Sequence, residues 1–342
     1  MYKINFGEPI HVHFIGIGGI SMSGLAEVLL KEGFAVSGSD AKESALTDHL
    51  EQMGAKEFYG QKASNIIEGI DVVVYTAAIH EDNEEFMEAK RQKLPMLSRA
   101  ELLGQLMRNY DMPIAVSGTH GKTTTTSMLS QILLADDQDP TLSVGGILKA
   151  IGGNIRVGDS ELFVAEACEY TNSFLHLFPK LAIILNIDAD HLDFFKDLQD
   201  IRNSFRKFAE LLPEDGVLVI NQQIPNVEEI TDGLACKVVT FGTDPSADYS
   251  AADIAHDGDS SFDVMHDGQK MGRMALSVTG EHNVLNALSA IAAADILGIP
   301  FVSMQKGLKE FRGTNRRFEY KGTKNGFTII DDYAHHPTEI RA

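Results

Sequence analysis

The sequence contains no tryptophan and only two cysteines among its 342 residues. Cys168 and Cys236 lie far apart, and the chain has no Cys-x-x-Cys pair or Cys/His cluster. This pattern argues against a structural zinc site. Two free thiols are typical of a reducing compartment, so the cysteine content favours a cytoplasmic protein.

The sequence also lacks a recognisable export or membrane segment. No apolar run approaches the roughly 20 residues that a membrane-spanning helix needs. The first eight residues have no basic region followed by an apolar one, so they do not resemble a signal peptide. We therefore expect a soluble cytoplasmic protein that is not inserted in a membrane.

Positive charge is scarce as well. The chain has 29 Lys and Arg against 49 Asp and Glu, which gives a formal net charge of −20. Such a polyanion has no general attraction for nucleic acid or for an anionic membrane surface. Any phosphate ligand must therefore be held locally, by backbone amides, helix N-termini and a few lysines or arginines.

The apolar pattern predicts an α/β fold. Strand-like and helix-like segments alternate along the first hundred residues, and the alternation begins again near residue 112, which indicates parallel strands with crossover helices. Residues 248–279 are more polar and contain turn signals, so we expect antiparallel hairpins there. The main expected strands are 10–15, 34–37, 71–75, 112–117, 162–165, 181–185, 217–220, 237–241 and 327–330, and the main helices are 22–30, 122–134 and 281–297.

Two breaks in this pattern suggest the domain boundaries. We expect an N-terminal Rossmann-like parallel-sheet domain at residues 1–109. A central P-loop ATPase-type α/β domain is expected at residues 110–323. Residues 324–342 are too few for a domain and are expected to form the opening stub of a third one.

A glycine-rich loop between the strand at 112–117 and the following helix carries the strongest chemical signal. The P-loop pattern G-x-x-x-x-G-K-[ST] requires a glycine where Val116 stands, but Gly118 supplies a tighter G-x-x-G-K-T arrangement. Its amides and the helix N-terminus can hold phosphate. Lys122 can reach the outer phosphates, and the Thr123 hydroxyl can ligate Mg²⁺. The predicted ATP-binding residues of this loop are Gly118, Thr119, His120, Gly121, Lys122, Thr123 and Thr124.

A second glycine loop follows the first strand. Gly16 and Gly18 fit the dinucleotide pattern G-x-G-x-x-G, whereas Ser21 stands at the third position. Asp40 ends the second strand, where an acid that binds a ribose hydroxyl is expected. This loop indicates a pyrophosphate near a helix N-terminus without identifying the nucleotide. An NAD(P)-dependent oxidoreductase is therefore an alternative at this point, and a regulatory nucleotide-binding module is another.

Polar side chains follow two further strands at the expected ligand-binding edge of the sheet. Glu166 ends the strand at 162–165, and His191 lies shortly after the strand at 181–185. Mg²⁺ prefers oxygen ligands, so Glu166 suits it and His191 is a less usual ligand. An acid in such a position could also be a charged loop residue that is exposed to solvent and has no functional role.

Other candidate nucleotide contacts come later in the chain. His282 and Asn283 open the helix at 281–297, where Asn could pair with an adenine edge or cap the helix. Arg316 and Arg317 are adjacent, and neighbouring side chains in an extended segment face opposite ways, so at most one is expected to meet a phosphate.

In their order, these motifs resemble those of the Mur ligases, and the resemblance covers the whole chain. The matching segments are residues 13–24 around the first glycine loop, Ser98-Arg99-Ala100-Glu101-Leu102-Leu103, residues 117–124, residues 186–191, Gly280-Glu281-His282-Asn283-Val284-Leu285-Asn286-Ala287, and Asp331-Asp332-Tyr333-Ala334-His335-His336-Pro337-Thr338-Glu339.

The resemblance implies an ATP-dependent ligase of peptidoglycan precursor synthesis. The lactyl carboxylate of UDP-N-acetylmuramate would attack the γ-phosphate of ATP, and the amine of L-alanine would attack the resulting acyl phosphate, releasing phosphate. Addition of a recycled tripeptide to the same sugar nucleotide is the alternative within the family. The first glycine loop would then bind UDP rather than NAD.

The resemblance also assigns roles to residues. Lys122 would stabilise the transferring phosphoryl group, Thr123 and Glu166 would hold Mg²⁺, and His191 would serve a second metal site. The nucleotide would be contacted by His282, Asn283, Arg316 or Arg317, and Asp331 or Asp332. The UDP-sugar would be bound by Gly16, Gly18, Gly19, Ser21, Met22, Ser23 and Asp40.

Two features depart from the family pattern. Many members have Glu-Ala-Asp-Glu-Ser-Asp where this chain has Glu166-Ala167-Cys168-Glu169-Tyr170-Thr171; the first acid is kept, so its metal role survives. The sequence ends at Ala342, before most of the third domain that the resemblance implies. We therefore expect a truncated chain that does not catalyse ligation alone, because the reaction depends on positioning and electrostatics from all three domains.

Overall fold

The protein is described by a computed structural model that covers residues 2–255, 260–314, 319–324, 326–334 and 336–341. These residues fold into two compact units. The first contains the chain up to Asp111, with Ile155–Val157 and His176–Phe178, and the second contains the rest. Arg316 and Arg317 lie outside the described residues.

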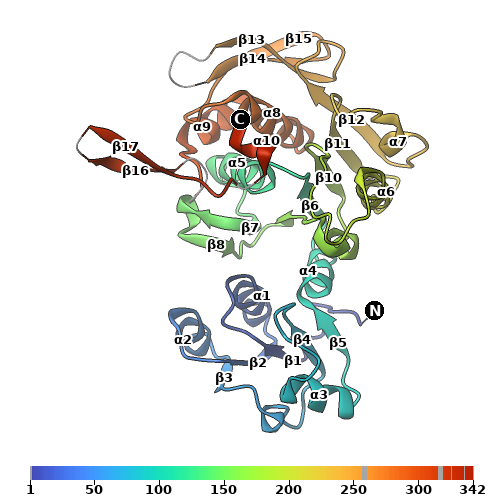
Figure 1. The fold of residues 1–342 in the computed structure, drawn as a ribbon, viewed down its shortest axis with the longest axis vertical. Helices are drawn as coiled ribbons and strands as arrows, with labels where there is room; N and C mark the ends of the chain where they lie inside the picture. Colours follow the sequence, from blue (N-terminus) through green and yellow to red (C-terminus); the bar gives the residue numbers. More distant parts are fainter. Residues whose placement is uncertain (1, 256–259, 315–318, 325, 335, 342) are drawn as a thin grey trace. The chain divides into compact units, whose positions relative to one another are not determined.

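The first unit is built on a five-stranded parallel sheet with the order β3-β2-β1-β4-β5 (Figure 1). The central strand β1 carries the glycine loop at its carboxyl end, beside the point where the strand order reverses, which is the usual ligand position in open α/β sheets. The strands are β1 (His11–Ile15), β2 (Ala35–Asp40), β3 (Lys56–Tyr59), β4 (Val72–Tyr75) and β5 (Met96–Ser98). The helices are α1 (Ile20–Lys31), α2 (Ala45–Gln52), α3 (Glu84–Arg91) and α4 (Arg99–Met107).

A buried polar network joins β1, β2 and α3. His13 Nε2 lies 2.6 Å from Glu85 Oε1, and both side chains are completely buried. Ser37 Oγ lies 2.8 Å from His13 Nδ1, and the Ser39 hydroxyl donates to Glu85 Oε2 at 2.5 Å. Since each of these polar groups has a partner, the network is stable in the interior and fixes α3 on the sheet.

Helix α4 begins with a capping box, in the Ser98–Leu103 segment noted in the sequence. The Glu101 amide donates to Ser98 Oγ at 3.3 Å, and the Ser98 amide donates to Glu101 Oε2 at 2.7 Å. Each bond satisfies an amide that the helix itself leaves without a partner.

We expect Ser98→Ala to lower the free energy of unfolding by about 1 kcal/mol, because the substitution removes this cap. Urea denaturation followed by circular dichroism measures the change. Ser64→Ala is the matched control, since Ser64 is an exposed serine of the same unit outside any described cap. Equal effects of the two substitutions would contradict the role of the cap.

The second unit is built on a ten-stranded sheet with the order β15-β14-β13-β12-β11-β10-β6-β9-β7-β8. Its strands are parallel from β13 to β7, and β14 and β15 extend the sheet as antiparallel hairpins. The strands are β6 (Met112–Ser117), β7 (Thr141–Leu148), β8 (Gly153–Arg156), β9 (Leu162–Glu166), β10 (Leu181–Ile184), β11 (Val217–Asn221), β12 (Lys237–Gly242), β13 (Tyr249–Ala255), β14 (Ser261–His266) and β15 (Gln269–Ala275).

Three helices of the second unit form one layer against this sheet. Helix α5 packs against both α8 and α9, and α8 also contacts strands β11 to β14 (Figure 1). The close approach of α9 to α5 needs a glycine, because a Cβ at Gly307 would lie 2.7 Å from Ile132 Cα. The helices are α5 (Lys122–Ala135), α6 (Leu198–Ala209), α7 (Glu228–Thr231), α8 (Glu281–Ile296) and α9 (Phe301–Glu310).

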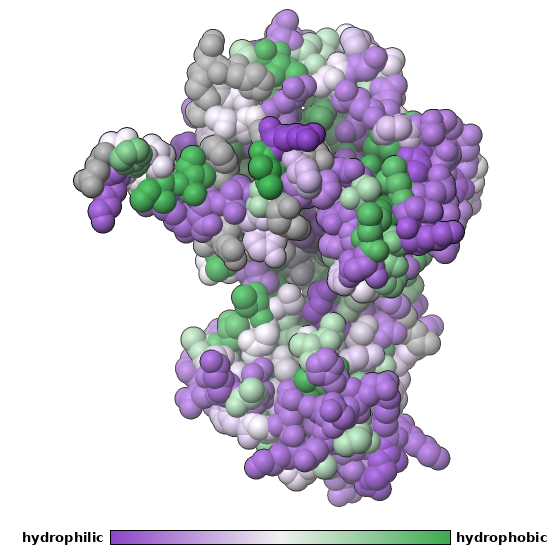
Figure 2. Space-filling model, in the orientation of Figure 1, coloured by the Kyte–Doolittle hydropathy of each residue, from purple (hydrophilic) through white to green (hydrophobic). Residues whose placement is uncertain are grey.

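The C-terminal residues form a separate antiparallel ribbon and a short helix. Strands β16 (Glu319–Lys324) and β17 (Phe327–Asp331) pair only with each other among the described strands, and α10 (Pro337–Arg341) follows. Apolar side chains are exposed along β17: Phe327 by 75%, Ile329 by 48% and Ile330 by 44%. Figure 2 shows the apolar surface of this ribbon.

The predicted α/β class and the principal elements are confirmed. Strands β6, β9 to β12 and β17 and helices α1, α5 and α8 lie within a few residues of the predicted bounds, and residues 248–279 form antiparallel hairpins as expected. The strand predicted at 34–37 extends to Asp40, three residues further. Both cysteines are free thiols, as expected.

Candidate active site

The sheet register brings three loops of the second unit to one edge. Strand β6 lies between β9 and β10, and all three are parallel. Glu166 is in register with Val116, and Ile184 with Ser117. The glycine loop, the end of β9 and the segment after β10 therefore meet at the carboxyl edge, where open α/β sheets bind ligands.

The unusual glycine spacing of the phosphate loop has a steric reason. Gly118 has φ +145°, and a Cβ there would lie 2.8 Å from Leu185 Cβ. Gly121 has φ +85° and is the N-cap residue before α5, and a Cβ there would lie 2.5 Å from Asn286 Oδ1. Both glycines are therefore required by the backbone and by close neighbours. The loop that they shape ends at the N-terminus of a helix, which favours a bound phosphate.

The segment after β10 holds this loop in place through hydrogen bonds. The His120 amide donates to Asn186 Oδ1 at 2.8 Å, and Asn186 Nδ2 donates to the His120 carbonyl at 3.0 Å. The Thr119 amide donates to the Asn186 carbonyl at 3.1 Å. The loop conformation is thus fixed by bonds within the protein itself.

Lys122 is held inside the loop. Its ammonium group donates to the Gly118 carbonyl at 2.6 Å, the Thr119 carbonyl at 3.0 Å and Glu169 Oε2 at 2.9 Å. Burial lowers the pKa of Lys122, but Glu169 and neighbouring acids outweigh that effect and hold the pKa above its ordinary value. The lysine is therefore a fixed positive charge at the phosphate loop.

Thr123 and Glu166 come together as the sequence predicts. The Thr123 hydroxyl donates to Glu166 Oε2 at 2.8 Å, and the Gly145 amide donates to the same oxygen at 2.9 Å. A hydroxyl and a carboxylate at a phosphate loop form an oxygen donor set suited to Mg²⁺. The donor chemistry of these residues fits the predicted metal.

His191 lies at the same edge in a separate cluster. The backbone of His191 has φ +53°. The ring nitrogen Nε2 lies 3.8 Å from Glu169 Oε1 and 3.9 Å from Asp190 Oδ2. The ring packs against Tyr170 at a tilt of 33°, with 4.5 Å between centroids, and the Tyr170 hydroxyl donates to Asp193 at 2.7 Å. Glu169 contacts both Lys122 and His191, so it links the two predicted functional groups.

The predicted adenine contacts open α8. Asn283 Nδ2 donates to the Thr279 carbonyl at 2.7 Å, and Asn283 Oδ1 accepts from Asn286 at 3.3 Å. Burial lowers the pKa of His282, and Asp332 opposes this shift. Asp331, in contrast, lies on β17, with Lys321 at 3.8 Å.

The N-terminal glycine loop is largely bonded to itself and to β2. The amides of Gly16 and Ile17 donate to the Ser39 carbonyl, and the Gly18 amide donates to Asp40 Oδ2 at 2.9 Å. Asp40 thus contacts the loop backbone in this structure. Ser21 and Met22 lie in the first turn of α1 and Ser23 follows, so the predicted UDP-binding residues lie at a helix N-terminus, a feature that favours phosphate.

Sequence reasoning missed three parts of this site. Glu169 was noted only as part of a variant segment, although its distance of three residues from Glu166 could have suggested the same edge. Asn186 was noted only as the start of the matching segment 186–191, and Gly145 gave no local signal, because their contacts with His120 and Glu166 join residues far apart in the chain.

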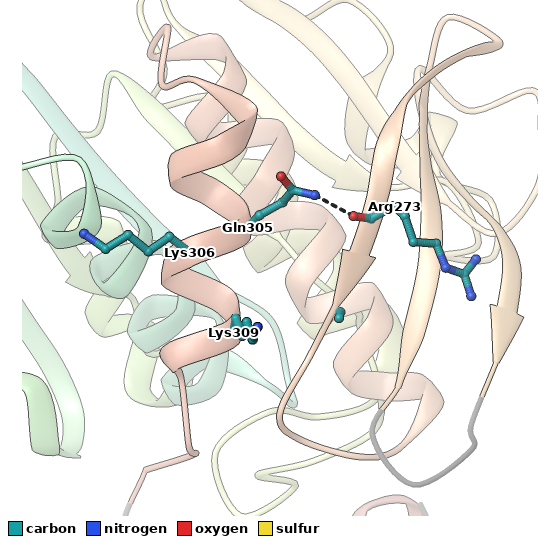
Figure 3. A pocket seen from close by; sticks show the side chains of 5 residues that line it. Arg273, Gln305, Lys306 and Lys309 are labelled. Carbon is teal, nitrogen blue, oxygen red and sulfur yellow. Dashed lines mark hydrogen bonds between the residues drawn. The ribbon is translucent and has the colours of Figure 1, made fainter.

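A pocket of about 310 Å³ lies elsewhere, between α9 and β15 (Figure 3). Arg273, Lys306 and Lys309 line it, and Gln305 Nε2 donates to the Arg273 carbonyl at 2.8 Å. The side chains of Arg273 and Lys306 point in different directions in Figure 3. Since these charges do not converge, the pocket is a weaker candidate for phosphate binding than the loop at β6.

Comparison with protein families matches almost the entire chain. The Mur ligase middle domain matches residues 116–294, the catalytic domain of the Mur ligase family matches residues 11–111, and the glutamate ligase domain matches residues 316–342. The chain belongs to the Mur ligase family. The expected family membership is therefore confirmed.

Individual Mur ligases are similar over the same length. The chain is 60% identical to the UDP-N-acetylmuramate–L-alanine ligase of Agathobacter rectalis, over 100% of this chain and 75% of that protein. It is 59% identical to the enzyme of that name from Lachnospira eligens, with the same coverage.

Solved Mur ligase structures share the fold. The UDP-N-acetylmuramate–alanine ligase of Thermotoga maritima has a TM-score of 0.79 at 32% identity, over 97% of this chain and 76% of that one. The UDP-N-acetylmuramate:L-alanyl-gamma-D-glutamyl-meso-diaminopimelate ligase of Neisseria meningitides has a TM-score of 0.80 at 31% identity, over 90% and 100%. Among the described helices of this Mur ligase, none is both long and apolar enough for a membrane span.

Proposed function

We propose that this Mur ligase joins L-alanine to the lactyl carboxylate of UDP-N-acetylmuramate, with conversion of ATP to ADP and phosphate. The observation that carries the proposal is the site at the edge of β6, in a chain 60% identical to a ligase of that name. Lys122, Thr123 and Glu166 supply the cation and the oxygen donors that phosphoryl transfer requires. The reaction takes place in the cytoplasm, where ATP is available, and the two free thiols agree with this compartment.

The first step forms an acyl phosphate. A carboxylate oxygen of the substrate bonds to the γ-phosphorus of ATP, the bond from that phosphorus to the bridging oxygen breaks, and ADP leaves. Lys122 moves from its contacts with Glu169 and the loop carbonyls to the transferring phosphoryl oxygens. The amides that follow Gly121 hold the adjacent phosphate at the start of α5.

Thr123 and Glu166 would hold Mg²⁺ when the ion is bound. The bound ion supplies positive charge that offsets the negative charge of the β- and γ-phosphates. The Gly145 amide keeps Glu166 Oε2 directed towards Thr123. His191, with Glu169 and Asp190 close to its Nε2, would serve a second metal site.

The second step forms the amide. The amine nitrogen of L-alanine attacks the acyl carbon, the bond from that carbon to the phosphate oxygen breaks, and the nitrogen loses a proton. The N-terminal loop contributes binding: the first turn of α1 at Ser21 and Met22 holds the UDP pyrophosphate. His282 and Asn283 hold the adenine of ATP.

An assay of ADP release tests this function. The protein, including any residues that its gene encodes beyond Ala342, is mixed with ATP, Mg²⁺, UDP-N-acetylmuramate and L-alanine. We expect ADP release only when all four are present, with the alanyl sugar nucleotide as the product identified by mass spectrometry.

Two parallel reactions test the alternatives. Turnover with a muramyl tripeptide amine in place of L-alanine, and none with L-alanine, would overturn the assigned amine substrate. A change of nicotinamide absorbance on addition of NADH or NADPH with the sugar nucleotide would instead favour an oxidoreductase.

A further inference from the structure

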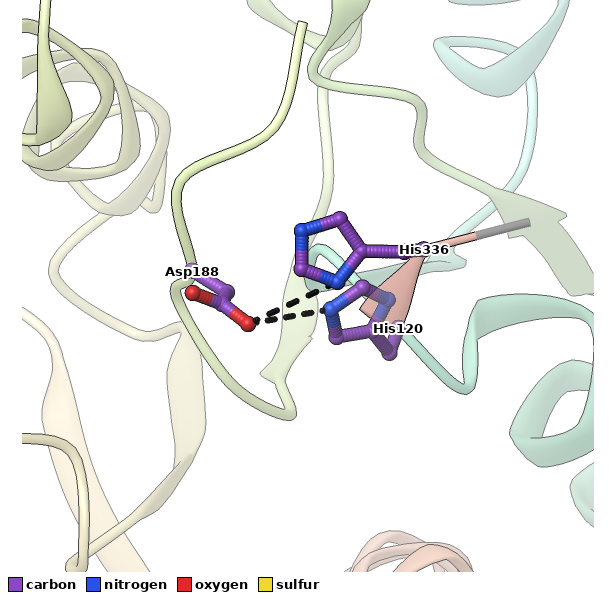
Figure 4. Close-up of side chains that lie close together, drawn as sticks. All are labelled: His120, Asp188 and His336. Carbon is purple, nitrogen blue, oxygen red and sulfur yellow. Dashed lines mark hydrogen bonds and ion pairs between the residues drawn. The ribbon is translucent and has the colours of Figure 1, made fainter. Parts of the chain in front are cut away.

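A cluster of two histidines and a carboxylate lies beside the phosphate loop (Figure 4). His120 comes from the loop, Asp188 from the segment after β10 and His336 from the residue before α10. Their ligand atoms all lie within 4.8 Å of one another. His120 Nε2 lies 3.3 Å from Asp188 Oδ2, and His336 Nδ1 lies 3.8 Å from the same oxygen. In Figure 4 both rings face this carboxylate.

The second nitrogen of His336 indicates how the ring is protonated. His336 Nε2 lies 3.2 Å from the Ala189 carbonyl oxygen, which can only accept a hydrogen bond. The ring therefore donates from Nε2, and in a neutral imidazole Nδ1 carries the lone pair that faces Asp188. Metal-bound histidines usually donate their other ring nitrogen to a carbonyl or carboxylate in this way.

The carboxylate and the first histidine are also held in place. The Ala189 amide donates to Asp188 Oδ1 at 2.8 Å, which leaves Oδ2 directed at the two rings. The Asp188 amide donates to Thr119 Oγ1 at 2.9 Å. The Asn186 amide group fixes the His120 backbone on both sides. Hydrogen bonds that do not involve His336 thus orient the other two ligands, His120 and Asp188.

We propose that His120, Asp188 and His336 form a site for a divalent transition metal of the zinc class. Two imidazoles and one carboxylate suit Zn²⁺, whereas Mg²⁺ prefers oxygen ligands throughout. Bonds of roughly 2.0–2.2 Å in a tetrahedral site place ligand atoms about 3.3–3.5 Å apart. The pair formed by His120 and Asp188 already has this spacing, at 3.3 Å.

This site is distinct from the oxygen donors of the proposed reaction. Thr123 and Glu166 are not among its ligands, and its third ligand comes from the segment after β17. Bound metal therefore fastens the C-terminal segment to the phosphate loop through His120. The proposal goes beyond the ligase activity and does not depend on its substrates.

Metal titration of the 342-residue protein tests the proposal. Co²⁺ replaces Zn²⁺ as a spectroscopic probe, with excess Mg²⁺ present to occupy oxygen sites. We expect visible absorption typical of four-coordinate Co²⁺ at one ion per chain, displaced by Zn²⁺. His336→Gln should weaken Zn²⁺ binding by about 100-fold in calorimetry, because one of the three ligands is lost. His80→Gln is the matched control, since His80 is an exposed histidine of the first unit, outside the cluster.

Two further measurements separate this site from its neighbours. Zn²⁺ binding should survive in Glu166→Gln and in His191→Gln, and X-ray absorption should find two imidazole ligands per Zn²⁺. Unchanged binding in His336→Gln, or loss in His191→Gln with a single imidazole ligand, would overturn the proposal. Asp188→Asn provides a second substitution at the site, and circular dichroism verifies that both variants are folded.

Discussion

Lys122→Ala is expected to lower the rate of ADP release by about 10³-fold while leaving the affinity for UDP-N-acetylmuramate nearly unchanged. The lysine is the cation at the phosphate loop, whereas the proposed UDP site lies on α1 in the other unit. A coupled ADP assay and calorimetry with the sugar nucleotide measure the two quantities. Equal losses of turnover and of UDP-sugar affinity would contradict this division of roles.

The same substitution should also destabilise the protein, and a second variant separates the two effects. Glu169 is only 2% exposed, so removal of Lys122 leaves a buried carboxylate without the lysine cation that pairs with it. Breaking such a pair costs about 3–5 kcal/mol. Lys122→Ala/Glu169→Gln should regain most of the free energy of unfolding in urea denaturation, yet remain inactive. Recovery of ADP release in the double variant would show that the charge of Lys122 is not needed.

Gly145→Ala is expected to raise the Mg²⁺ concentration needed for half-maximal ADP release by about 10–100-fold. This is the range found when a group that orients a metal ligand is lost. A Cβ at this position would lie 2.1 Å from Glu166 Oε2. The atoms in the way are the end of a flexible side chain, so the carboxylate moves and the strand is retained. Glu166 then leaves Thr123, and the oxygen donor pair is lost. The Mg²⁺ concentration at half-maximal ADP release measures this change.

Gly242→Ala is the matched control for that experiment. Gly242 ends β12 in the same unit, and a Cβ there would lie 3.6 Å from the nearest side-chain atoms, which is an ordinary contact. Its Mg²⁺ dependence and thermal stability should match those of the parent protein. If Gly145→Ala behaves like this control, the Gly145 amide does not orient Glu166.

Much of the fold could be predicted because local patterns agree with the tertiary structure. Strand β6 and helix α5 are continuous apolar or helical segments on either side of a glycine loop, so their bounds were predicted closely. Strand β7 was missed, since Gly145 and Gly146 interrupt its pattern. Strands β3 and β5 were missed as well: β3 begins with the charged Lys56 and Glu57 and so has no continuous apolar run, and the three residues of β5 are too few to show a periodicity.

The sequence by itself determined the α/β class, the two glycine loops and the position of Glu166 at the sheet edge that carries the phosphate loop; its pairing with Thr123 was implied by the family resemblance. Glycine, lysine and threonine have fixed chemical roles at a helix N-terminus, and parallel strands deliver their carboxyl ends to one edge. The tertiary structure alone decided that Glu169 holds Lys122, that Gly145 holds Glu166 and that His336 joins His120 and Asp188. These contacts join residues that are distant in the chain. The local sequence pattern does not indicate which side chains meet at the edge of the folded sheet.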